Sequence, residues 1–181
     1  MMDAVDLLVL GLGNPLCGDD GAGVAAVARL RERYEPPPGV LVLDGGTLGL
    51  SLLPHLRRAR AVILVDAIAA NEPPGTLVRL TGDDVGRAAA HRLSVHQVGV
   101  ADLLDGARLL GGYPEALVLV GVVPAHTELS IERSPAVQAR IDDLVQAVVD
   151  EAGRMGHTLE RRGADDEALL RSAAHDRVLG L

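Results

Sequence analysis

Four short, largely apolar runs recur along the chain, at Asp6–Leu12, Val40–Leu43, Ala61–Val65 and Ala116–Val123. Strands buried on both faces of a parallel sheet carry such continuous runs, because helices cover both sides of the sheet. Each run is closed by a glycine, a proline or an aspartate, residues that favour turns. The pattern therefore predicts four buried strands in a largely parallel sheet.

The segments between these runs carry helical patterns. The first helix is rich in alanine and is ended by the breaker Pro36–Pro38. Ser134 and Pro135 form a good N-cap and first-turn pair for the last helix. Ser94 and Gln97 have the spacing of a capping box at the start of another. The predicted helices are 20–30, 48–57, 94–110 and 134–151.

One further strand should run against the others. Thr76–Leu80 alternates apolar and polar residues, and its connection from Ala61–Val65 is too short for a helical crossover. We expect it to be antiparallel and at an edge of the sheet. The order of elements predicts an α/β fold: one three-layer domain with a mostly parallel twisted sheet of about five strands and helices on both faces. We expect this domain to span residues 1–153, with 154–181 a charged tail, helical or mobile.

Composition excludes several classes of partner. The chain has no Phe or Trp and two Tyr, so it lacks the aromatic platforms used to stack on bases. Its formal net charge of −8 disfavours binding to a nucleic-acid backbone. Cys17 is the single cysteine, which excludes an internal disulfide and argues against a cysteine-based zinc site. Signal-peptide and membrane-span patterns are missing, so we expect a soluble cytoplasmic protein with no membrane partner.

Acidic residues follow three of the predicted strands. Asp20, with Asp19 beside it, comes after the first strand, Asp44 after the second and Asp66 after the third. Ligand sites in open α/β sheets lie outside the carboxyl ends of the strands, and His96, in the first turn of its helix, could reach the same edge. Two carboxylates and an imidazole suit a divalent transition metal, with positions left open for a substrate group.

Each of these residues also has an ordinary structural explanation. Asp20 could cap the helix that it begins. Asp44 and Asp66 are typical turn residues at strand ends. A single histidine near a helix start, such as His96, is more often structural or solvated than a ligand. Taken one by one, these residues do not identify an enzyme.

A dinucleotide site is one alternative. Gly11 and Gly13 follow a strand, and Asp44 ends the next strand, where a ribose-binding acid should lie. However, Leu16 occupies the position of the third glycine. Asp19 and Asp20 would also repel a pyrophosphate at the helix N-terminus. This interpretation is disfavoured.

A thiol nucleophile is another alternative, with Cys17 attacking and His96 as its base. The helix dipole would lower the pKa of a cysteine in this loop, but the adjacent Asp19 and Asp20 would oppose that shift. A free, partly buried thiol is favoured for Cys17.

The order of the motifs, more than any single motif, resembles the hydrogenase maturation proteases. The resemblance extends over about Leu7 to Val149, which is most of the chain. It rests on GLGNPLCGDDGAGV (Gly11–Val24), LDGGTLGLSLL (Leu43–Leu53), LVDAI (Leu64–Ile68), SVHQVGVADLL (Ser94–Leu104) and LVGVVP (Leu119–Pro124).

This resemblance implies an endopeptidase that removes a C-terminal extension from the precursor of a [NiFe]-hydrogenase large subunit after nickel insertion. The family's metal-ligand positions fall on Asp20, Asp66 and His96; some relatives have Glu at the first of these. Asp44 matches a position linked to substrate fidelity or cleavage, so all four residues are implied in catalysis. The resemblance implies that nickel is supplied by the substrate, and another divalent metal could replace it in an isolated sample.

The expected partner is thus the large-subunit precursor, and a monomer is favoured. We expect the substrate-borne nickel to complete an incomplete set of ligands and to serve in recognition, with Asp44 orienting the peptide or assisting proton transfer. The alternative is a non-catalytic maturation chaperone on the same fold that binds a metal or a partner protein, since fold alone does not fix function.

Overall fold

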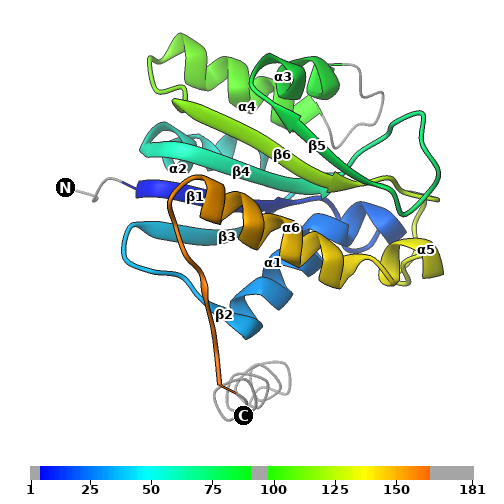
Figure 1. Cartoon of the computed structure of the whole chain (residues 1–181). Helices are drawn as coiled ribbons and strands as arrows, with labels where there is room; N and C mark the ends of the chain where they lie inside the picture. The colour runs from blue at the N-terminus through cyan, green and yellow to red at the C-terminus, as the bar shows by residue number, and fades with distance from the viewer. Residues whose placement is uncertain (1–4, 91–97, 164–181) are drawn as a thin grey trace, which may run out of the picture.

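A computed structural model describes residues 5–90 and 98–163. Its centre is a five-stranded sheet with the strand order β3-β1-β4-β6-β5 (Figure 1). The strands are β1 (Val5–Leu12), β3 (Val40–Gly46), β4 (Ala59–Ala67), β5 (Leu77–Thr81) and β6 (Ala116–Val122). Four of them are parallel, and β5 pairs antiparallel with β6 at one edge. The predicted α/β fold and its antiparallel edge strand are therefore confirmed.

Helices cover both faces of the sheet (Figure 1). Odd-numbered residues of β1, such as Leu7 and Val9, pack with α1 (Ala22–Arg33) and α6 (Ile141–Arg154). Even-numbered residues, such as Leu8 and Leu10, pack on the other face with α2 (Leu53–Arg57), α3 (Asp83–Ala90) and α4 (Val98–Leu109). Because successive side chains of a strand point to opposite faces, one apolar run serves both cores. This explains why the strands read as continuous hydrophobic segments.

The helices differ from the predicted ones in three places. The predicted helix over 48–57 is a 3₁₀ turn, η2 (Gly49–Leu52), followed by the short α2. The predicted helix over 134–151 is two helices, α5 (Pro135–Gln138) and α6, because the chain tightens at Arg140, whose N–H bonds the Val137 carbonyl. Helix α3 was not predicted; it begins after Gly82, which has a positive φ of 53°, and buries Val85 and Ala89 against the sheet. The predicted capping pair at Ser94 and Gln97 lies outside the described residues.

Shorter elements complete the described part. The 3₁₀ turns η1 (Gly18–Gly21) and η2 (Gly49–Leu52) precede α1 and α2. A small second sheet pairs β2 (Tyr34–Glu35) with β7 (Glu160–Arg161), and Leu159 beside it is buried in the core. Among the described residues, no helix is both long and apolar enough to cross a bilayer.

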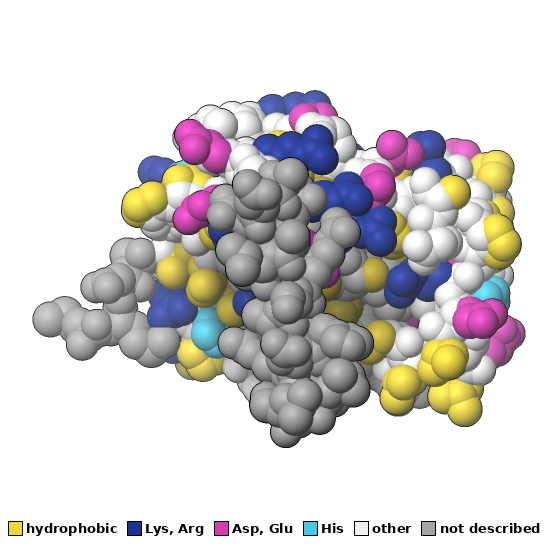
Figure 2. Space-filling model, turned by 90° about the horizontal axis from the view of Figure 1, so that it is seen from below, with side chains coloured by type: hydrophobic (Ala, Val, Ile, Leu, Met, Phe, Trp, Pro, Cys, Tyr) yellow, Lys and Arg dark blue, Asp and Glu magenta, His cyan; other side chains and the backbone are white. Residues whose placement is uncertain are grey.

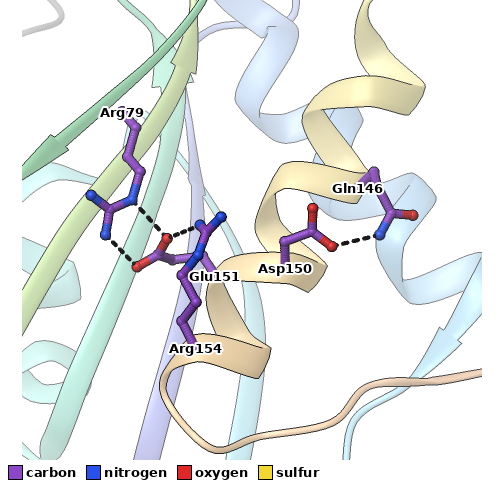
Figure 3. Close-up of polar contacts among 5 residues, drawn as sticks. All are labelled: Arg79, Gln146, Asp150, Glu151 and Arg154. Atoms are coloured by element: carbon purple, nitrogen blue, oxygen red, sulfur yellow. Dashed lines mark hydrogen bonds and ion pairs between the residues drawn. The ribbon is translucent and has the colours of Figure 1, made fainter.

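A buried carboxylate on α6 ties that helix to the edge strand (Figure 3). Both Glu151 oxygens accept hydrogen bonds from Arg79 of β5 at 2.8 Å, and Arg154 donates a third at 2.8 Å. The Glu151 side chain is 3% exposed, whereas that of Arg79 is 48% exposed. Hydrogen bonds from Arg79 outweigh burial and, with those from Arg154, hold the pKa of Glu151 below its ordinary value of 4.5.

We expect Glu151→Ala to lower the free energy of unfolding by about 2–3 kcal/mol, because it leaves the arginines unpaired and opens a buried space. The pKa of Glu151 is lower in the folded state than in the unfolded state. Its contribution to the free energy of unfolding is therefore complete above about pH 4.5 and is lost as the pH falls through the folded-state pKa. Urea titrations at pH 7 and pH 3.5 measure both effects. The matched control is Asp150→Ala, which removes only an exposed hydrogen bond to Gln146 and should cost less than about 0.5 kcal/mol.

Candidate active site

The carboxyl ends of β1, β3 and β4 meet at one edge of the sheet, here called the carboxyl edge. Gly11 of β1 lies in register with Asp44 of β3 on one side and with Val65 of β4 on the other. Asp66 is the next residue of β4, and the turn η1 that contains Asp20 follows β1. Parallel strand order thus brings the three predicted aspartates to a common edge.

A glycine sets how closely η1 and α1 approach this edge. A Cβ atom on Gly23 would lie 2.1 Å from the carbonyl oxygen of Val65 and 2.5 Å from that of Leu12. A side chain at this position would therefore push the helix away from β4. Gly23 allows α1 to start directly against the strand that ends in Asp66, which keeps Asp20 beside the ends of β1 and β4.

Asp20 is 4% exposed, and its Oδ2 accepts the N–H of Asn14 at 2.7 Å. It does not cap α1, which has Gly21 at its N-cap and no side-chain cap. The capping explanation for Asp20 is therefore wrong. Its carboxylate is instead turned back toward the end of β1, where Gly13 and Asn14 leave the sheet.

Asp66 is 3% exposed and lies within β4, paired in register with Gly121 of β6. Its Oδ1 accepts the N–H of Ala67 at 2.7 Å. Because β4 continues to Ala67, Asp66 is a strand residue and not a turn residue. A buried carboxylate inside a parallel strand is costly unless it is hydrogen-bonded or bound to a cation.

Asp44 differs from these two residues because its side chain is exposed. Its Oδ1 accepts the N–H of Gly46 at 3.0 Å, and Gly46 has a positive φ of 44°. The prediction that Asp44 stabilises a backbone bend is confirmed. The exposed carboxylate remains within reach of a molecule that approaches the carboxyl edge.

Asp19, next to Asp20, has a different environment. It is fully buried and accepts four hydrogen bonds, from the N–H groups of Ala125, His126 and Ser134 and from the Ser134 hydroxyl, at 2.7–3.3 Å. Burial raises the pKa of Asp19, but these hydrogen bonds outweigh it and hold the pKa below its ordinary value of 3.8. With its oxygens occupied in this way, Asp19 connects η1 to the segment 125–134, and Asp20 is the better candidate for a ligand.

His96 lies outside the described residues, so its predicted place at the carboxyl edge stays a prediction. Among residues 5–90 and 98–163, no group of three or more His, Cys, Asp or Glu side chains is arranged to hold a metal ion. Asp20 and Asp66 are the two predicted ligands that lie among the described residues, and both are buried at the carboxyl edge.

Sequence reasoning missed one neighbour of this site, His126. The ring of His126 lies against Gly18, where a Cβ atom would approach its Cε1 to 2.5 Å. The His126 N–H reaches Asp19, and its carbonyl accepts the Asp19 N–H at 3.2 Å. His126 follows β6 by several residues without a recognisable motif, so only the tertiary contact reveals it.

Comparison with known proteins assigns the family. A family model described as hydrogenase maturation protease matches residues 24–151. The chain is also 37% identical over 171 residues to the Hydrogenase 2 maturation protease of Escherichia coli, which covers 94% of this chain and 99% of that protein. The chain belongs to the hydrogenase maturation protease family.

Other relatives of this protease agree. The hydrogenase expression/formation protein HoxM of Azotobacter vinelandii is 37% identical over 93% of this chain and 82% of its own length. The solved structure of the hydrogenase maturating endopeptidase HybD from E. coli superposes with a TM-score of 0.83 at 36% identity, covering 87% of this chain and 98% of that one. A [NiFe] hydrogenase maturation protease HybD from Thermococcus kodakarensis superposes with a TM-score of 0.66 at 28% identity, over 82% and 99% of the two chains.

The glycines of the dinucleotide-like pattern have packing roles in this protease. A Cβ atom on Gly13, whose φ is 115°, would lie 1.8 Å from the Asp20 carbonyl oxygen. A Cβ atom on Gly11 would lie 2.7 Å from the Gly23 carbonyl oxygen. Both therefore serve the close approach of the strand end to η1 and α1, and the buried aspartates occupy the place where a pyrophosphate would bind.

Cys17 is free and half-buried, as predicted, and its backbone forms a parallel β-bridge with Ser130. We expect Cys17→Ser to keep cleavage within about twofold of the unsubstituted protease, because the backbone supplies the bridge and serine preserves the shape of the side chain. Initial rates of precursor cleavage measure this. Loss of cleavage by a variant with an unchanged melting temperature would instead support a thiol nucleophile.

Proposed function

We propose that this protease removes the C-terminal extension of a [NiFe]-hydrogenase large-subunit precursor after nickel has been inserted. The observation that carries the proposal is the pair of buried carboxylates, Asp20 and Asp66, at the carboxyl edge of a chain that belongs to the maturation protease family. The curated E. coli relative is a Hydrogenase 2 maturation protease, and its structural counterpart is a maturating endopeptidase.

Nickel belongs to the substrate in this proposal. Asp20 and Asp66 provide carboxylate oxygens, and His96 would provide an imidazole; Ni(II) accepts such mixed ligands. Two carboxylates in an almost dry site fit a cation chemically, since an approaching cation offsets the cost of burying them. When bound, the metal would supply a check that the precursor is loaded, together with polarisation of a carbonyl or a water.

Asp44 would act on the peptide and not on the metal. Its side chain is exposed at the end of β3, and one of its oxygens is held by the Gly46 N–H. That hydrogen bond restrains the carboxylate, and the side chain remains exposed to solvent. Asp44 is thus suited to orient the scissile peptide or to accept a proton during cleavage.

Intact-mass spectrometry of the precursor tests the proposal. A nickel-loaded large-subunit precursor from the same source is incubated with the protease, beside a matched sample of nickel-free precursor. We expect a mass loss that equals one C-terminal peptide, in the loaded sample alone. Stable binding of loaded precursor without any mass loss would overturn the endopeptidase and favour a maturation chaperone.

A further inference from the structure

Three exposed aliphatic side chains lie beside the carboxyl edge, on two segments that the buried Asp19 holds together. They are Leu16, Leu129 and Ile131, which are 56%, 86% and 82% exposed and are here called the apolar rim. A parallel β-bridge joins Cys17 to Ser130, with hydrogen bonds from Gly18 N–H to the Ser130 carbonyl at 2.7 Å and from Ser130 N–H to the Leu16 carbonyl at 2.9 Å. This register places Leu129 beside Leu16 and Ile131 beside Gly18.

The apolar rim is fixed relative to Asp20. The four hydrogen bonds to Asp19 hold both ends of the segment 125–134, and Asp19 is the neighbour of Asp20 in the same turn. The Ser130 hydroxyl adds a bond to the Glu132 carbonyl and accepts the Glu132 N–H. The backbone that carries these three aliphatic side chains is held in place, and the side chains themselves bury little area in the isolated protein, which favours a role in binding.

The segment that carries Leu129 and Ile131 has an excess of negative charge. Glu128 and Glu132 flank Leu129 and Ile131, are exposed, and form no ion pair with any residue that the structure describes. Arg133, next to Glu132, bonds the neutral Gln138 side chain and keeps its positive charge, so the segment carries two carboxylates against one guanidinium.

Figure 2 shows the same combination in the space-filling view. Hydrophobic side chains gather beside acidic side chains and a histidine at the right-hand end, which is the end where the parallel strands finish in Figure 1. A partner complementary to this end would offer aliphatic side chains together with lysine or arginine.

We propose that the apolar rim is the docking surface for the precursor, and that it binds an aliphatic segment of the large subunit that has a basic residue beside it. This inference rests on the proposed function, because it places the protein substrate next to Asp20. Contact at the apolar rim would stabilise the bound precursor and the transition state of cleavage to the same extent. Its loss should therefore raise KM and leave kcat nearly unchanged.

The test is the rate of cleavage of nickel-loaded precursor as a function of its concentration. We expect the double variant Leu129→Ser/Ile131→Ser to raise KM at least about tenfold and to leave kcat within about twofold. The matched control is Leu109→Ser, since Leu109 is also 86% exposed but lies at the far end of α4. Its KM should equal that of the unsubstituted protease, and melting temperatures confirm that all variants fold.

A second pair of variants tests the charge. Glu128→Lys/Glu132→Lys should raise KM and reverse its dependence on salt, because attraction to a basic segment becomes repulsion that salt screens. Glu115→Lys, at an exposed position near the start of β6, is the control and should change neither KM nor the dependence of KM on salt. An unchanged KM in the Leu129/Ile131 variant, with normal cleavage by the unsubstituted protease, overturns the docking surface alone. Absence of cleavage by the unsubstituted protease overturns the proposed function and this inference with it.

Discussion

Replacing Asp66 with asparagine is expected to reduce cleavage of nickel-loaded precursor by at least about a hundredfold while the fold is retained. Asparagine keeps the volume of the side chain and can accept the Ala67 N–H through its carbonyl oxygen. It removes the negative charge at the carboxyl edge, where a cation would need it. The chemistry of the site changes, but its packing does not.

The same result is expected for Asp20→Asn, which keeps an acceptor for the Asn14 N–H. Single-time-point mass spectrometry and initial rates measure the loss of activity, and thermal unfolding followed by circular dichroism measures the fold. The exposed Asp102→Asn on α4 serves as a control for removal of one negative charge. Cleavage at the normal rate by either buried variant would remove that residue from the proposed set of ligands.

Asp19→Ala is expected to act mainly on stability, with a loss of about 3–5 kcal/mol in the free energy of unfolding. The substitution removes the acceptor of four hydrogen bonds and leaves the N–H groups of Ala125, His126 and Ser134 without it in a largely buried position. Cleavage should fall as well, because the segment 125–134 and the turn that holds Asp20 lose their connection. Urea titration is the measurement.

Ser134→Ala is the graded control, because it removes the hydroxyl and keeps the backbone donor. The hydroxyl also caps α5 by accepting the Val137 N–H, so the variant should cost about 1–2 kcal/mol. Since the pKa of Asp19 is depressed in the folded state, its stabilisation is complete above about pH 3.8 and declines as the pH falls through the folded value. The difference between Asp19→Ala and the unsubstituted protease should therefore shrink at pH 3. If Asp19→Ala lowers the free energy of unfolding by less than about 1 kcal/mol at pH 7, Asp19 does not hold the segment 125–134 in place.

The sequence by itself determined most of the fold. Continuous apolar runs identified β1, β3, β4 and β6, because strands covered on both faces have no polar side. A short connection identified β5 as the antiparallel edge strand. The order of the motifs identified the family, and the position of acids after strands brought Asp20, Asp44 and Asp66 to one edge, since parallel strands end together.

Only the tertiary structure separated Asp19 from Asp20. Adjacent aspartates are equivalent in sequence, but one accepts four hydrogen bonds from a segment more than 100 positions away, and the other faces the end of β1. The pairing of β2 with β7 and the apolar rim were likewise decided by long-range contacts. Local periodicity records which residues are buried within an element, whereas the partner of a buried polar group depends on segments that meet only when the chain has folded.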